Sequence, residues 1–476
     1  MNILNKNLSL KYDIIVTLIN GIVVIGGIFI LNGLIARIHG LEVLGEFLLV
    51  KRTISSSMGI LLIGLNIALP NYLSRNFDKS YADNSYVLFM LATFPLTVLS
   101  IISVIWFDIK GFNENYFWYY VIFSFGMCSQ FMTYAIFRGY MNMIGANIFQ
   151  LIGTAIIPIL VFIYVSTLHD SLFWIGSFSI LVMISSFLFR NQGFRLYTIK
   201  ADKIKKLFIY GFERVPSFIS QFILLAAVPI FIAQKVDFNS VAYFNSSLSL
   251  VRLALIIVNP IGLVLLPRIS NKVASGSLEE INNKLFILLK AGIFFSVIVS
   301  IYCYSNAALI FKYWLGSESY KGAQILQFTI LALPFYTLAG LCRSPIDAIS
   351  ERGYNSIIYT ISAIIMLLIL YAGKIFEFDF LYTAIISFLT SYIILAFLSM
   401  YLIKKFYKSK FWNYKLFRDI IAGGFIIYII NYLLIEMSDL FQLLGQTIIY
   451  LLIGLFYILK VKTGWLAELR GLFFAR

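Results

Sequence analysis

Long apolar segments run through almost the whole chain, and a short stretch of charged or turn-forming residues separates each from the next. An apolar run of about 20 residues crosses the hydrocarbon core of a bilayer as an α-helix. The pattern therefore predicts an all-α, polytopic membrane protein of about 14 transmembrane helices. These helices are expected near residues 14–36, 48–72, 84–107, 116–137, 147–167, 172–189, 208–234, 241–267, 285–306, 323–342, 355–373, 380–403, 419–436 and 440–459.

Two strongly basic stretches, RNQGFRLYTIKADKIKK and KKFYKSKFWNYKLFR, interrupt this series of apolar runs. Lys and Arg concentrate in the cytoplasmic loops of membrane proteins, so both stretches are expected to be cytoplasmic linkers. The predicted divisions are an N-terminal six-helix lobe (1–190), a basic linker (191–207), a C-terminal six-helix lobe (208–403), a second linker (404–418), and an extra helix pair with a C-terminal tail (419–476).

The segment 35–75 recurs in the second half of the chain at a shift of 197 positions. Both copies read as a helix, a tight loop, a second helix, a proline and a basic residue. A duplicated helical hairpin in a hydrophobic chain suggests a two-lobed transporter. The identical positions are Ile35, Ala36, Phe47, Ile60, Leu69 and Pro70, which fall on Ile232, Ala233, Phe244, Ile257, Leu266 and Pro267.

Composition and charge agree with a membrane protein and exclude a nucleic-acid-binding one. Hydrophobic residues make up 61% of the chain and charged residues only 12%, which is more apolar surface than one globular core could bury. The net charge of +15 comes from Lys and Arg between the apolar runs. Of these, 26 fall on the side of the N-terminus and 8 on the other, so both termini are predicted to be cytoplasmic.

The sequence offers little for catalysis or cofactor binding. It has no GxxxxGK[ST], HExxH or GxSxG motif, and Cys128, Cys303 and Cys342 have no metal-like spacing. His39 and His169 stand alone near the expected outer boundary, and we interpret them as polar interface residues. We therefore expect no enzyme activity, no catalytic residue, no metal and no cofactor, although sparse carboxylates leave a membrane enzyme acting on glycans as a remote alternative.

Ionisable residues within the apolar runs are the main functional signal, because a charge at a helix centre costs roughly 2.5–3.5 kcal/mol on insertion scales. Arg252 lies about halfway along an apolar run, where we expect it to face a polar cavity; a hydrogen bond to a neighbouring helix is the structural alternative. Arg37, Glu46, Lys51 and Arg52 flank one predicted outer loop. Each could reach the headgroups by itself, but four charges on one hairpin favour a shared role.

Several cations around one cavity would suit an anion that must cross the bilayer, and Arg holds phosphate oxygens bidentately. A lipid pyrophosphate is such an anion. For Glu213, Arg214 and Lys290 we favour contact with the headgroups, and we keep them as secondary candidates with Glu46 and Asn245. The hydrogen bonds that a saccharide needs, or bridges between helices, could come from Asn66, Gln130, Asn147, Gln150, Gln221, Asn245 and the Ser-rich stretch 246–249.

The sequence resembles the polysaccharide repeat-unit (O-antigen type) flippases of the multidrug/oligosaccharidyl-lipid/polysaccharide exporter superfamily over most of its length. The segments that carry the resemblance are ARIHGLEVLGEF with GLNIALPNYLSR, AIFRGYMNMIGANIFQ, and YGFERVPSF followed by VAYFNSSLSL and VLLPRIS. The resemblance implies two six-helix bundles in a V that open alternately to either side. In the related flippases of lipid-linked peptidoglycan precursors, arginines on the first, second and eighth helices line the cavity, and Arg37, Arg52 and Arg252 lie on the matching helices.

By this resemblance we expect a secondary transporter of the bacterial cytoplasmic (inner) membrane. It would move an undecaprenyl-diphosphate-linked oligosaccharide from the inner to the outer leaflet. The expected partners are this lipid-linked glycan, membrane lipid, a coupling cation (Na⁺ or H⁺) and a polysaccharide polymerase, with no nucleic acid, and we expect a monomer. The alternative within the same superfamily is a cation-coupled multidrug exporter, and a polymerase acting on lipid-linked glycans is a further one.

Overall fold

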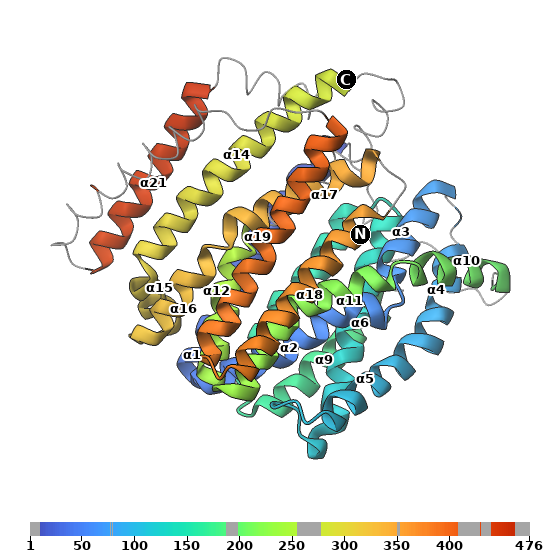
Figure 1. Ribbon diagram of the computed structural model, residues 1–476. Helices are drawn as coiled ribbons and strands as arrows, with labels where there is room; N and C mark the ends of the chain where they lie inside the picture. Colours follow the sequence, from blue (N-terminus) through green and yellow to red (C-terminus); the bar gives the residue numbers. More distant parts are fainter. Residues whose placement is uncertain are drawn as a thin grey trace. The chain divides into compact units, whose positions relative to one another are not determined.

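The computed structural model describes residues 10–76, 78, 80–186, 199–254, 278–349, 353–407, 429 and 439–461. Throughout these ranges the secondary structure is helical, with short 3₁₀ and π turns and no strand (Figure 1). The prediction of an all-α polytopic membrane protein is therefore confirmed.

The chain forms two compact units that divide between Ala242 and Tyr243. Helix α12 (Phe238–Val251) begins in the first unit and ends in the second. The other helices of the first unit are α1 (Leu10–Ile38), α2 (Leu41–Leu61), α3 (Leu65–Asn76), α4 (Ser80–Leu88), α5 (Phe94–Trp106), α6 (Phe117–Gly139), α7 (Met143–Leu151), α8 (Ile157–Tyr164), α9 (Leu168–Ser186), α10 (Ala201–Phe212) and α11 (Val215–Lys235). The second unit adds α14 (Leu278–Ser305), α15 (Ala307–Leu315), α16 (Tyr320–Ile330), α17 (Leu333–Ile349), α18 (Tyr354–Ile375), α19 (Phe380–Tyr407) and α21 (Asp439–Val461).

Ten helical segments among the described residues are long and apolar enough to cross a membrane, or eleven with α2 and α3 counted as one bent span. The predicted helix 419–436, apart from residue 429, and residues 255–267 of the predicted helix 241–267 lie outside the described residues. The predicted span 48–72 is corrected, because it is two helices bent by 49° and the first begins at Leu41. Ile63 and Gly64 have positive φ angles of 46° and 68°, which end the regular helix at this point.

Two spans of the first unit contain a π-helical turn shortly before a proline. The turn Phe89–Thr93 precedes Pro95 at the start of α5, and the turn Ile152–Ile156 precedes Pro158 at the start of α8. Proline cannot donate the helical hydrogen bond and its ring crowds the preceding turn. Widening the helix at that point lets each span continue across the membrane without a break.

Helix α6 is central in the first unit, where it packs against α9, α3 and α7. Leu61, Leu69, Phe89 and Cys128 belong to the buried cluster around its C-terminal half, and the Cys128 thiol is free and buried as expected for a packing residue. In the second unit α19 packs against α17 and α18. Figure 1 shows α18 and α19 running alongside each other.

The C-terminal helix α21 belongs to the second unit and packs against α14. Tyr302 of α14 hydrogen-bonds Thr447 through their hydroxyls at 2.8 Å, and its ring lies 4.9 Å from that of Tyr450. At the first residue of α21, the Asp439 carboxylate accepts a hydrogen bond of 2.7 Å from Nζ of Lys312. The extra helix is thus attached by packing and by polar contacts.

Candidate functional site

The middle of α2 carries a polar stretch inside an otherwise apolar span. Arg52 is 9% exposed, and Lys51 is half-buried with its Nζ 5.3 Å from the centre of the Phe47 ring. The prediction that both cations lie at the start of a span is wrong, because α2 begins at Leu41. Both residues therefore lie roughly 15 Å along the helix.

Hydroxyl groups continue this polar stretch by one turn. Ser55 and Ser56 each donate a hydrogen bond to the carbonyl oxygen of Arg52, at 3.2 and 2.7 Å. Ser57 donates likewise to Ile54 at 2.9 Å. Such bonds satisfy the hydroxyl protons but leave lone pairs on each oxygen, so this face of α2 can still accept hydrogen bonds.

Arg37 lies in the last turn of α1 and is exposed, one short loop before the start of α2. Arg37, Lys51 and Arg52 all belong to the first unit, whereas Arg252 belongs to the second. A cavity that contains all four cations stays a prediction.

Glu46 of α2 meets residues that the sequence did not connect with it. Its Oε1 lies 3.9 Å from Nε2 of His169, near the start of α9. The same nitrogen lies 3.1 Å from the hydroxyl of Tyr120 on α6, and the ring of Tyr116 stacks on the imidazole at 3.6 Å between centroids. We call Glu46, Tyr116, Tyr120 and His169 the outer cluster, since the predicted topology places them at the outer side. His169 is therefore part of a side-chain network.

The amides of the first unit that were expected to bind a saccharide or bridge helices mostly bridge helices. Asn20 of α1 donates to Gln150 of α7 at 2.9 Å and contacts Asn147 at 3.4 Å. Gln130 of α6 donates to the hydroxyl of Thr154 at 2.6 Å. These bonds join α1 to α7 and α6 to the π turn Ile152–Ile156, which matches the structural alternative.

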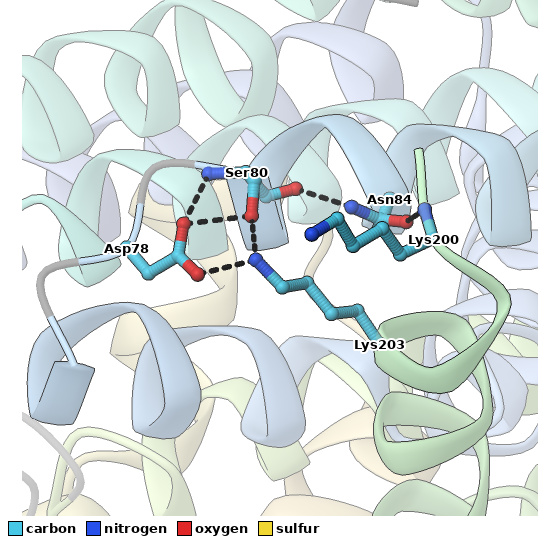
Figure 2. Close-up of polar contacts among 5 residues, drawn as sticks. All are labelled: Asp78, Ser80, Asn84, Lys200 and Lys203. Carbon is cyan, nitrogen blue, oxygen red and sulfur yellow. Dashed lines mark hydrogen bonds and ion pairs between the residues drawn. The ribbon is translucent and has the colours of Figure 1, made fainter. Parts of the chain in front are cut away.

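Helix α10, which follows the first basic linker, is docked on α4 and the segment before it (Figure 2). Nζ of Lys203 donates to both the Asp78 carboxylate and the Ser80 hydroxyl. Ser80 also donates to Asp78, with its hydroxyl at 2.7 Å and its backbone N–H at 3.0 Å. The side-chain oxygen of Asn84 accepts a hydrogen bond of 2.7 Å from the backbone N–H of Lys200, so a second polar contact holds the start of α10.

The electrostatics of this contact favour the ion pair. Partial burial would raise the pKa of the Asp78 carboxyl, but hydrogen bonds from Lys203 and Ser80 outweigh that effect and leave the pKa below its ordinary value. The Lys203 ammonium also lies 5.2 Å from the centre of the Tyr81 ring. The side chain of Lys203 is 20% exposed, so this is a half-buried rather than a surface pair.

The secondary candidates Glu213 and Arg214 form the turn between α10 and α11. Glu213 is exposed. The guanidinium of Arg214 lies 3.8 Å from the centre of the Tyr210 ring and donates to the Tyr210 carbonyl at 2.8 Å. Arg214 thus has a structural role in the turn.

In the second unit, Arg252 follows the last residue of α12 and is half-buried. Its Nε is inaccessible to solvent and has no hydrogen-bond partner within the described ranges. Asn245, two turns earlier, is fully buried, and Lys290 of α14 places its Nζ 5.8 Å from the centre of the Phe286 ring. Arg252 is therefore a half-buried cation at the end of α12, and its role in binding an anion stays a prediction.

Among the residues whose placement is described, no group of three His, Cys, Asp or Glu side chains could hold a metal ion. Neither the outer cluster nor the docking of α10 was predicted from the sequence. Neither has a periodic signal, because Glu46, Tyr120 and His169 come from helices far apart in the chain. The only local sign was that each histidine stands alone in an apolar setting.

No family model and no curated protein matches this chain. Solved structures do match it. The lipid II flippase MurJ in an inward closed conformation is 17% identical in sequence. The match covers 94% of this chain and 98% of the MurJ chain, with a TM-score of 0.64. An inward-facing multidrug resistance MATE family transporter of the MOP superfamily is 16% identical in sequence. Its match covers 83% of this chain and 98% of the transporter, with a TM-score of 0.63.

The MATE transporter VcmN of Vibrio cholerae in its bent form is 14% identical, covers 84% of this chain and 97% of its own, and gives a TM-score of 0.54. At such identities the likeness concerns the fold. This chain therefore has the fold shared by a lipid II flippase and the multidrug transporters of the MOP superfamily.

Proposed function

We propose that this protein is a secondary transporter that flips an undecaprenyl-diphosphate-linked oligosaccharide from the inner to the outer leaflet of the bacterial cytoplasmic membrane. It would carry out no chemical reaction of its own. The fold, which is shared with membrane transporters, supports the transport function. The charges on the spans support an anionic substrate.

The observation that carries the proposal is the pair Lys51 and Arg52 in the middle of α2. Arg52 is buried in the middle of a helix whose carboxylates, Glu42 and Glu46, lie nearer its start, and a charge at a helix centre costs roughly 2.5–3.5 kcal/mol on insertion scales. A buried cation with this energetic cost is expected to have a function. A cation that faces a passing ligand selects an anion, which disfavours cationic drugs as the main cargo.

A lipid diphosphate fits this arrangement better than a simple anion. It carries more than one negative charge, which two adjacent cations on α2 and the half-buried Arg252 could share. The flippase MurJ, which has this fold, is described as acting on lipid II. The sugars attached to the diphosphate would meet the hydroxyl groups of Ser55 and Ser56 on the same face of α2.

A second candidate function is the export of drugs, since transporters described as multidrug MATE proteins share the fold. Exporters of cationic drugs need acidic groups in the binding cavity. The outer cluster contains one such group, Glu46, and a drug exporter would depend on it rather than on Arg52.

The test uses cells in which this chain is the sole transporter for their surface glycan. Arg52→Ala should reach the membrane at normal levels, lower surface glycan at least tenfold, and cause the lipid-linked repeat unit to accumulate inside. Arg52→Lys should restore part of the activity because it keeps the charge but not the bidentate geometry.

The matched control is Lys374→Ala, which removes an exposed cation from the last turn of α18. It should leave surface glycan unchanged. Normal surface glycan in Arg52→Ala, or a loss of resistance to cationic dyes with no change in glycan, would replace the flippase by the drug exporter.

A further inference from the structure

The imidazole of His169 is held by three different groups of the outer cluster. Nε2 lies 3.1 Å from the Tyr120 hydroxyl and 3.9 Å from the Glu46 carboxylate, and the Tyr116 ring stacks on the imidazole at an angle of 14°. A phenol oxygen, a carboxylate and an aromatic face all interact well with a cation. These three contacts favour a cation at His169, whereas the partial burial of the imidazole opposes it.

The hydrogen bonds of Tyr120 favour Nε2 as the nitrogen of His169 that carries the proton in the neutral form. The Tyr120 hydroxyl donates its one proton to the Gly111 carbonyl at 3.1 Å and accepts the Asn113 N–H at 3.3 Å. Its contact with His169 then needs Nε2–H as the donor. Nδ1 is left as the nitrogen that takes up a further proton.

We propose that His169 and Glu46 form a proton-binding site at the outer end of the first unit, and that the bound proton is the ion coupled to transport. The coupling rests on the proposed transport function, whereas the proton site does not. A proton from water outside binds Nδ1 of His169, so the pair changes from a net charge of about −1 to about 0 with no other bond made or broken.

The composition of the site favours a proton over Na⁺. Sodium needs several oxygen ligands, and here a single carboxylate faces an imidazole whose Nε2 already serves as a donor. The side chains of His169 and Glu46 are 21% and 25% exposed, so solvent protons can reach both. Partial burial opposes the charged imidazolium, which keeps the proton exchangeable.

Other titratable groups face this site from each neighbouring element. They are Glu42 on α2 one turn before Glu46, Tyr116 and Tyr120 at the start of α6, and Asp170 beside His169, whose carboxylate accepts a hydrogen bond of 2.6 Å from Thr167. Glu42 and Glu46 repel each other when both are ionised. An imidazolium beside Glu46 relieves that repulsion and draws the outer half of α2 toward α9.

This attraction connects proton binding with the transported anion, because α2 also carries Lys51 and Arg52. Proton uptake from outside would hold the outer end of α2 against α9, and proton release would free it. The proton thereby acts on the helix that carries the proposed substrate cations, without contacting the substrate.

The proton site can be tested without any substrate, because the chain contains only two histidines. The full-length protein with ¹⁵N-labelled histidine is placed in nanodiscs of phosphatidylethanolamine and phosphatidylglycerol and titrated by NMR. His39→Gln assigns the signals and keeps a donor for the contact of His39 with the Phe162 carbonyl, 3.0 Å away. We expect the His169 signals to show the imidazole taking up a proton as the pH is lowered.

The carboxylate of Glu46 should govern this titration. In Glu46→Gln the midpoint for His169 should fall by about one pH unit, because a nearby negative charge favours the imidazolium. Glu42→Gln, one turn away, should have a smaller effect. A His169 that stays in one protonation state throughout the range, or that titrates equally in wild type and Glu46→Gln, overturns the proton site.

Coupling is tested with glycan export from cells held at about pH 6 and about pH 8 outside. The wild type and His39→Gln should export at different rates at the two values, and in His169→Gln the ratio of the rates should fall to about one. A pH dependence unchanged in His169→Gln overturns the coupling. Wild-type cells that export no glycan at all overturn the proposed function, and the NMR titration then decides the proton site by itself.

Discussion

A β-carbon added to Gly64, at the break between α2 and α3, would lie 2.6 Å from the carbonyl oxygen of Gly211 in α10. One added to Gly211 would lie 2.0 Å from the carbonyl oxygen of Ile63. The backbone of α10 thus rests directly on the bend of the second span. Only glycine allows this approach, and Gly64 also has a positive φ of 68°.

Gly211→Ala should therefore destabilise the first unit by roughly 1–3 kcal/mol, since neither contacting atom belongs to a flexible side chain. The measurement is thermal unfolding of the purified protein in detergent. Gly26→Ala is the matched control, because a β-carbon there meets nothing within 4 Å. It should be neutral or slightly stabilising. Equal unfolding temperatures for the two variants would show that α10 is not held at this point.

The contact between Asp78 and Lys203 should make the docking of α10 sensitive to acid. The folded-state pKa of Asp78 is lowered, so its carboxylate contributes fully to stability at pH values above the ordinary aspartate pKa of about 4. This contribution is lost as the pH falls through the folded-state pKa.

A double-mutant cycle of Asp78→Asn and Lys203→Gln should give a coupling of about 1 kcal/mol or less at neutral pH. The coupling should vanish in acid below the folded-state pKa. Thermal unfolding at the two pH values measures it, and a coupling that grows on acidification would contradict the assignment.

The predicted topology places the N-terminus, the α10 region and the C-terminus in the cytoplasm. Reporter fusions after Asp78, Asp202 and Arg476 should all report the inside. A fusion after Asp108, in the loop before α6, is the control and should report the outside. An exterior signal from the Asp202 fusion would reverse the assignment of the outer cluster.

Arg52 and Arg252 should act on the same anion although they belong to different units. Arg252→Ala alone should fold and reach the membrane, since removing a half-buried cation relieves an insertion cost, but export of surface glycan should fall. The double variant Arg52→Ala with Arg252→Ala should lose less than the product of the two single losses, because two cations that bind the same diphosphate depend on each other. Multiplicative losses would indicate two separate roles.

Much of the fold could be predicted from the sequence because lipid imposes a simple rule on it. Backbone groups inside the bilayer must bond within the chain, so an apolar run of sufficient length becomes a helix. Helix α18 (Tyr354–Ile375) and α19 (Phe380–Tyr407) coincide closely with the runs 355–373 and 380–403. The break at Ile63 and Gly64 was missed, since one glycine between apolar residues does not distinguish a kink from a continuous helix.

The candidate site was less predictable. Arg52 was singled out by type, because a guanidinium in an apolar run is conspicuous, but its depth was misjudged along with the start of α2. Glu46 was noticed as a charge on a hairpin, and its partner His169 was set aside as an interface residue. Their encounter depends on how α2 packs beside α6 and α9, which no periodicity along one helix encodes.

The amide network of the first unit has a consequence for biogenesis. Asn20 finds its partner in Gln150, which lies 130 residues further along the chain. At cellular rates of synthesis the second residue is made on the order of ten seconds after the first. During that interval α1 enters the lipid with a polar amide that has not yet met its partner. The bond between α1 and α7 can therefore form only after this interval, and the pace of translation between the two helices sets how long it lasts.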